Sequence, residues 1–214
     1  MSQIVVDPRD LGFLSQSTPF SPVPPGARAF GYVPDLRACL PGDLVLLRKI
    51  EPDIFGKSIA KAQGEFSPDD ARWTHAAVYL YDDLIVEAVP FGGVKTRSLY
   101  TDVPNRVLRV RRRRDLISDD RYKIALRALS MLGHRYSYLA ALMIGWRSGL
   151  SHWDRLGIAN VGPVIICSKV FHDAFVEITR SLLQGCSIDR PVTPAHLSAT
   201  ADLDDVAIGW VRLT

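Results

Sequence analysis

Long hydrophobic runs are missing from this sequence. Its longest apolar stretches, Leu139–Trp146 and Val161–Cys167, fall well short of the ~20 residues that a transmembrane helix needs. The N-terminus has no basic segment followed by an apolar one, so no Sec-type signal peptide is expected. These absences predict a soluble protein that is cytoplasmic in its producer or exported without a cleaved signal peptide.

Cysteine is scarce as well. Three cysteines occur, Cys39, Cys167 and Cys186, at wide and irregular spacing. No CxxC or Cys/His cluster has zinc-site spacing, and the sequence gives no reason to expect a metal or a cofactor. An odd number leaves at least one thiol free, which favours a reducing compartment or an export route that does not depend on disulfides.

The sequence also has little excess charge. A formal net charge of +3 is too small to indicate nucleic acid as a partner, and none is expected. The 214 residues, 47% of them hydrophobic, exclude a disordered or fibrous protein and can form one core. Residues 1–38 are rich in proline, glycine and serine, which predicts an extended arm on the surface, without helix or inner strand. The domain itself then covers residues 39–214.

Within this domain the pattern predicts strands first and helices afterwards. Strands are expected at 44–50, on both sides of Asp82-Asp83, after Gly92-Gly93, at 106–114 and at 206–213, with a short helix within 51–72. Helices are expected at 121–133, 138–147 and 167–185, with a short one opening at Pro194. Strands beside segregated helices predict an α+β fold, with a central antiparallel sheet packed against the helix that begins at Cys167.

Cys167 stands where an apolar stretch gives way to this helix. A helix N-terminus carries partial positive charge and unpaired N–H groups, and both lower the pKa of a thiol by stabilising its thiolate. A buried, inert cysteine is the alternative. Cys39 precedes a turn, and Cys186 follows a helix end, where the dipole raises a thiol pKa. We expect both of these to be fillers.

Five histidines compete for the role of base: His75, His134, His152, His172 and His196. His75 opens an apolar strand, a rigid element that can hold an imidazole in place, and we prefer it for this reason. His172 lies about 140° around the helix from Cys167 at ~3.6 residues per turn, so it points elsewhere. The other three are expected to be structural or exposed.

Glu87 is the expected partner of the histidine. It lies inside the apolar strand LIVEAV, where an unpaired carboxylate is costly, and a third group commonly orients the base in Cys–His sites. A plain two-residue turn at Asp82-Asp83 would place it on the wrong face from His75. An odd-numbered connection or a bulge would place it directly across from His75, whereas a solvent-facing edge glutamate predicts the plain hairpin.

The motifs PGDLVLL, WTHAAVYL, IVEAV followed by GGV, GHRYSY, ICSKVFHDAF and TPAHLS occur in this order over residues 41–200. This order resembles the permuted NlpC/P60 papain-like cysteine hydrolases, especially their YiiX/YebB-like branch, with lecithin:retinol acyltransferases as more distant relatives. The resemblance implies Cys167 as nucleophile, His75 as base and Glu87 as orienting residue.

Further site residues follow from the same resemblance. It implies that Tyr136 lines the site, and we expect Trp73, Ser168 and Lys169, which flank the catalytic motifs, to contact substrate. The sequence departs from the family at two points. The usual Cys-Ser-Glu is Cys-Ser-Lys here, and the usual Tyr-Asp pair is Tyr136-Ser137. These changes keep the triad and bear on the substrate.

The sequence thus predicts a cysteine hydrolase that cleaves an amide bond in a peptidoglycan peptide or a similar amide or isopeptide. As a bacterial secreted effector it would add an immunity or secretion-system protein as partner. One rival is a lipid-directed thiol acyltransferase or phospholipase, with Trp146, Trp153 and residues 139–166 supplying an apolar groove. A second rival is an inactive binding domain on the same fold.

The run Arg111–Arg114 belongs to none of these motifs. Alternation along a strand sends neighbouring arginines to opposite faces, so the run is not one continuous basic patch. We interpret it as a solvated edge strand that resists aggregation, with contact to phospholipid headgroups or an anionic wall polymer as the alternative.

Overall fold

The computed structural model describes residues 3–20, 22–90, 92–134, 166–188 and 191–213, and its architecture is α+β. A six-stranded antiparallel sheet has the order β6-β5-β4-β3-β7-β8. Its strands are β3 (Leu44–Lys49), β4 (His75–Tyr81), β5 (Leu84–Val89), β6 (Gly93–Ser98), β7 (Arg106–Arg112) and β8 (Asp204–Val206). The alternating side chains of the middle strands are buried on both faces, because each face is covered by other parts of the chain.

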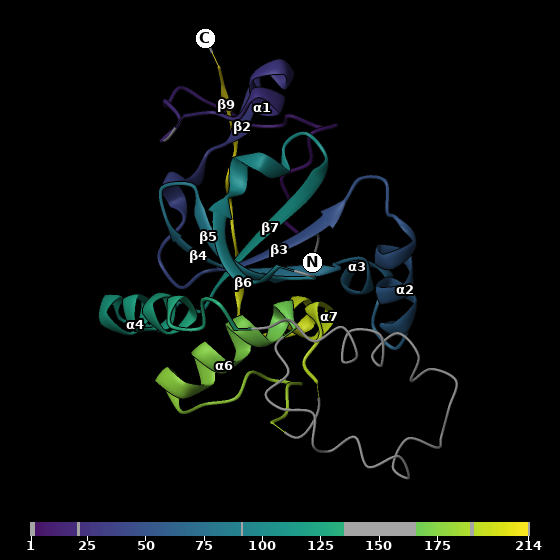
Figure 1. The fold of residues 1–214 in the computed structure, drawn as a ribbon, viewed down its shortest axis with the longest axis vertical. Helices are drawn as coiled ribbons and strands as arrows, with labels where there is room; N and C mark the ends of the chain where they lie inside the picture. Colours follow the sequence, from purple (N-terminus) through teal and green to yellow (C-terminus); the bar gives the residue numbers. More distant parts are fainter. Residues whose placement is uncertain (1–2, 21, 91, 135–165, 189–190, 214) are drawn as a thin grey trace.

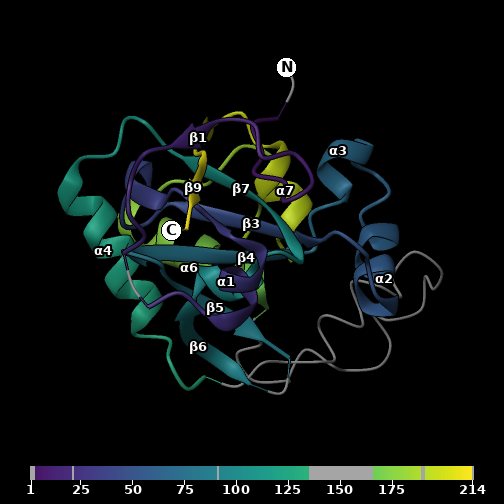
Figure 2. The same cartoon turned by 90° about the horizontal axis from the view of Figure 1, so that it is seen from above.

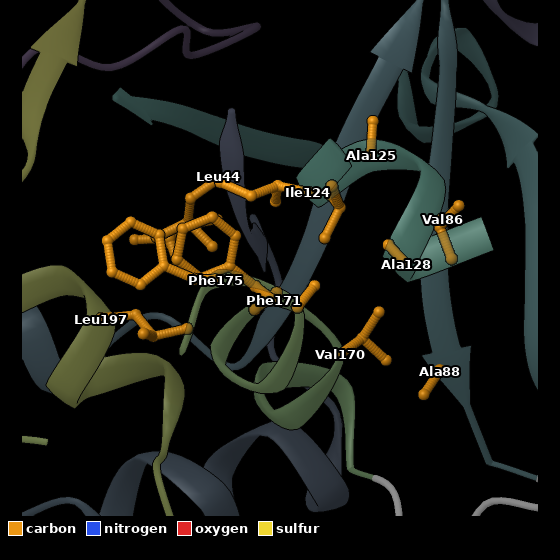
Figure 3. Close-up of a cluster of buried hydrophobic side chains, with 14 of the residues drawn as sticks. Leu44, Val86, Ala88, Ile124, Ala125, Ala128, Val170, Phe171, Phe175 and Leu197 are labelled. Carbon is orange, nitrogen blue, oxygen red and sulfur yellow. The ribbon is translucent and has the colours of Figure 1, made fainter. Parts of the chain in front are cut away.

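Helices cover one face of the sheet. They are α4 (Ser118–Leu129), α6 (Cys167–Thr179) and α7 (Pro194–Ala199), and they lie together on one side in Figure 1. The apolar stripe of α6 meets the sheet between Leu44 and Val86, as Figure 3 shows. Phe171 and Phe175 stack there with ring centroids 5.7 Å apart. This packing holds α6 against β4 and β5.

The N-terminal segment covers the opposite face. In Figure 2 its purple trace runs over the sheet, with α6 beyond. It forms β1 (Leu14–Ser15), α1 (Pro25–Phe30) and β2 (Tyr32–Pro34), and the first and last of these flank β9 (Trp210–Arg212) in a second sheet. The prediction of an arm without a helix is therefore wrong, whereas β1 and β2 are edge strands, so the described part of this segment forms no inner strand. Proline at the first helical position suits a helix, and Gly31, at φ 84°, ends it.

The remaining elements correct several sequence-based boundaries. Residues 51–72 form two helices, α2 (Ile54–Ala62) and α3 (Pro68–Ala71). Helix α6 ends at Thr179 rather than at residue 185, because Arg180 adopts the left-handed conformation. The expected last strand is divided between β8 and β9, which belong to different sheets. The helix expected at 138–147 lies outside the described residues.

The arginine run is largely structural. Strand β7 lies between β3 and β8, so the expectation of an edge strand is wrong. Arg111 is buried, and its guanidinium donates to the backbone carbonyls of Leu197, Ser198, Thr200 and Leu203 at and beyond the end of α7. Arg112 pairs with the buried Asp43 at 2.6 Å. The contacts of Arg111 join the sheet to the C-terminal segment, and that of Arg112 joins β7 to the residue before β3.

Replacing Arg111 with methionine should lower the free energy of unfolding by about 2–4 kcal/mol, because several buried carbonyls lose their donor. The control is Arg114→Met, since the Arg114 side chain is 77% exposed and surface changes of this kind stay within about 0.5 kcal/mol. Urea unfolding followed by circular dichroism measures both. Equal stability of the two variants would contradict the structural role of Arg111.

Candidate active site

The fold brings the start of β4 next to the start of α6. His75 is the first residue of β4, and Cys167 is the first residue of α6. Because α6 packs along β4 and β5, the Cys167 thiol reaches the imidazole of His75 and hydrogen-bonds with it. The two residues are thus neighbours in space, although far apart in the sequence.

A bulge places Glu87 beside His75. Tyr81 pairs with Leu84 around the two-residue turn Asp82-Asp83, but the register shifts between Tyr79 and Tyr81, so that Glu87 pairs with Ala77. The expected bulge is present, and it brings the glutamate to the histidine's face of the sheet. Glu87 lies diagonal to His75 rather than directly across, and its Oε2 is 2.8 Å from His75 Nε2.

Arg97, on the adjacent strand β6, completes this network. Its Nε and Nη2 donate to the two carboxylate oxygens of Glu87 at 2.6 and 2.8 Å, and its Nη1 donates to Asp102 at 2.7 Å. Burial alone would raise the pKa of Glu87, but the hydrogen bonds from His75 and Arg97 hold it well below its usual range. Glu87 is therefore a fixed carboxylate that orients His75 through Nε2.

Sequence reasoning missed Arg97 and Asp102. Arg97 pairs with Ile85 and is diagonal to Glu87, so the pairing of β5 with β6 was the signal that could have revealed it. A basic residue four positions after Gly93 is otherwise an ordinary feature of a strand that leaves a turn. Only the register identifies it as the partner of Glu87.

The mutual effects of Cys167 and His75 on their pKa values favour an ion pair. Burial alone would raise the pKa of the Cys167 thiol, but the charge and hydrogen bond of His75 lower it below its ordinary value, helped by the backbone N–H groups of Ala76 and Ser168. Burial would conversely lower the pKa of His75, and the Cys167 thiolate and Glu87 raise it to about 9. Both shifts favour the pair of thiolate and imidazolium over the pair of neutral groups.

The other thiols and histidines lie in different surroundings. Burial raises the pKa of Cys39 far above its usual value and that of Cys186 to about 11, so neither thiol is ionised near neutral pH. His172 is buried on α6, 3.5 Å from Asp173 through Nδ1. His196 closes a capping box with Thr193, and His134 donates its backbone N–H to Met131. His152 lies outside the described residues.

The residues expected to contact substrate lie in different surroundings from one another. Trp73 is fully buried and donates through Nε1 to Gln3, so it belongs to the core rather than to a substrate wall. Ser168 is fully buried too, and its Oγ donates to the Val192 carbonyl. Lys169 is 42% exposed and pairs with Asp173 at 2.6 Å. Tyr136 lies outside the described residues.

The described part of the chain contains no cluster of three or more His, Cys, Asp or Glu residues arranged to hold a metal ion. Among the same residues, no helix is both long and apolar enough to cross a bilayer. Comparison with models of known protein families finds no match, and comparison with curated proteins finds none either.

Proposed function

We propose that this protein is a cysteine hydrolase that cleaves an amide bond through Cys167, His75 and Glu87. The single observation that carries the proposal is the hydrogen-bonded chain from Cys167 through His75 to Glu87, in which the pKa of the thiol is lowered and that of the imidazole is raised to about 9. A nucleophile, a base and an orienting group within hydrogen-bond reach are the usual requirement for covalent acyl transfer.

The chemistry follows from these groups. The Cys167 thiolate attacks the carbonyl carbon, and the resulting oxyanion lies near the first N–H groups of α6, where the helix dipole is positive. The imidazolium of His75 gives its proton to the leaving nitrogen as the C–N bond breaks, which leaves a thioester on Cys167. Water then attacks the thioester while His75 takes up a proton, and the acid and the free thiol are released.

The raised pKa of His75 favours an amide as the scissile bond. An amine leaves poorly unless it is protonated, so amide cleavage needs a proton donor that is charged at neutral pH. His75, with a pKa of about 9, is such a donor. The alcohol of an ester leaves more readily, so ester cleavage depends less on such a proton donor. Peptidoglycan peptides or other amides and isopeptides are therefore the substrate class that we propose.

The arrangement also agrees with the proposed relationship to the permuted NlpC/P60 papain-like hydrolases. The histidine strand precedes the cysteine helix in the sequence, and an antiparallel sheet packs against that helix. The His-Glu-Cys order along the chain and the strand position of the histidine support this assignment. The role of a secreted effector with an immunity protein stays a prediction.

The test compares the wild-type protein with Cys167→Ala. Each is incubated with purified peptidoglycan fragments and, separately, with phospholipid vesicles, and the products are followed by mass spectrometry. We expect new amine and carboxylate termini from peptide fragments with the wild-type protein alone. Fatty-acid release that depends on Cys167 would replace the amidase proposal with the lipid-directed one. Inactivity on both, with an unreactive thiol, would support a binding domain.

A further inference from the structure

A cavity of about 330 Å³ adjoins the triad. His75 forms part of its wall, so the residue that contacts Cys167 also faces this cavity. The end of β3, helix α2, the start of β4 and the end of β5 line it. Its apolar lining comes from Pro52, Phe55, Ile59, Ala60, Val89 and Pro90. An acyl substrate at Cys167 would therefore have room for a further group next to His75.

The remaining lining of the cavity is strongly basic. It contains the five cationic side chains of Arg48, Lys49, Lys57, Arg72 and Arg106, against one carboxylate, Asp53. Lys49 pairs with Asp53 at 2.6 Å, and Arg106 pairs with Asp102 at 3.0 Å. Even after these two ion pairs are counted, the cationic side chains that line the cavity outnumber the carboxylates near it among the described residues.

Arg48 and Arg72 are the two of these cations that have a buried nitrogen without a partner in the described part of the chain. The Nε atoms of both are buried and have no hydrogen-bond partner among the described residues. The nearest carboxylate oxygen to Arg48 belongs to Asp7, 3.9 Å from Nη2. Arg72 is better served, by Asp69 at 3.2 Å and Gln3 at 3.2 Å. Arg48 thus presents a partly buried guanidinium with most of its donors unused.

The two guanidinium groups also repel each other. Burial, and after it the charge of Arg72, lowers the pKa of Arg48. Buried arginines are ordinarily paired, as Arg97 is with Glu87 and Asp102. An anion with two or more oxygens would satisfy such a pair of guanidinium groups through charge-assisted hydrogen bonds.

We propose that this cavity is a substrate subsite that binds an oxyanion, a carboxylate or a phosphate, next to the scissile bond. The subsite deepens the proposed function and rests on it, because the anionic group would belong to the molecule whose carbonyl reaches Cys167. Arg48 and Arg72 bind the oxyanion, and the apolar wall contacts the carbon atoms between that group and the carbonyl. Substrates without a negative charge at this position are disfavoured.

The first experiment compares two thiol reagents that differ in charge, iodoacetate and the neutral iodoacetamide. The rate of Cys167 alkylation by each is measured for the wild-type protein, for Arg48→Gln and for the control Arg114→Gln. The control removes the same charge from an exposed position. We expect the iodoacetate-to-iodoacetamide rate ratio to fall about fivefold in Arg48→Gln, because the anionic reagent loses the attraction of one partly shielded charge several ångströms away. In the control the ratio should stay unchanged.

The neutral reagent separates the possible failures. Iodoacetamide labelling of Arg48→Gln at the wild-type rate shows that the site is folded, and an unchanged ratio in that protein would overturn the subsite. Failure of both reagents to label Cys167 in the wild-type protein would overturn the proposed function instead.

Calorimetric titration of the wild-type protein with succinate and with inorganic phosphate tests the subsite without the thiol. Binding that Arg48→Gln weakens about fivefold or more supports the subsite, and the better ligand identifies the oxyanion as carboxylate or phosphate. Binding of neither ligand, or binding that Arg48→Gln leaves unchanged, contradicts it.

Discussion

Iodoacetamide at pH 5.5 should modify Cys167 at least about tenfold faster than Cys39 or Cys186. The His75 imidazolium lowers the pKa of the Cys167 thiol below its ordinary value, so a larger fraction of this thiol than of the other two is ionised at this pH. With a pKa of about 11, Cys186 is ionised to only about three parts in a million. A more basic thiolate is intrinsically more nucleophilic, which offsets part of this difference. Cys39 is further suppressed, because burial raises its pKa more strongly.

Peptide mapping by mass spectrometry after timed alkylation measures the three rates in one sample. Cys167→Ala is the matched control, and in that protein no cysteine should be modified on the same timescale. Labelling of Cys186 at a rate similar to Cys167 would show that the thiol of Cys167 is not activated. The proposed nucleophile would then have to be abandoned.

Replacing His75 with glutamine should slow the alkylation of Cys167 at pH 5.5 by about 10- to 100-fold. Without the imidazolium, burial dominates and the pKa of the thiol rises, so a much smaller fraction of it is ionised at this pH. The greater nucleophilicity of the more basic thiolate recovers part of the loss. The control is His134→Gln, at an exposed position outside the network.

The pH dependence of alkylation should also differ between the wild-type protein and His75→Gln. In the wild-type protein the ion pair exists above the lowered pKa of Cys167 and below the pKa of His75, which is about 9. Alkylation should therefore begin to rise with pH well below the ordinary thiol pKa, whereas in His75→Gln it should rise only near pH 9. Hydrolysis, which also needs the imidazolium as acid, should fall above about pH 9. Identical alkylation profiles for both proteins would contradict the ion pair.

Local sequence patterns predicted much of the proposed site. Cys167 lies where an apolar stretch changes to a helix, and His75 lies at the start of a strand. Both are local patterns, and they were sufficient to select these two residues as candidates. The departure from hairpin pairing needed to bring Glu87 to the histidine also followed from the two-residue periodicity of strands. The α+β class followed from the order of strands and helices.

Other features depended on the packing of distant residues. The register shift at Tyr79–Tyr81 made the Glu87 contact diagonal, because Glu87 pairs with Ala77, two residues along the ladder from His75. Arg97 became the partner of Glu87 only through the β5–β6 register. The N-terminal segment, which its composition suggested to be a plain arm, gained strands by pairing with β9 at the other end of the chain.

The sequence by itself therefore determined the nucleophile and base that we propose, since helix starts and strand starts are local properties of the chain. Tertiary structure alone decided how these groups are charged and what lies beside them. The low pKa of Glu87, the ion pair of Cys167 with His75, and the basic cavity around Arg48 and Arg72 arise from burial and from charges on separate elements. The physical reason is that desolvation and charge–charge interactions depend on distance in space, which no local sequence pattern specifies.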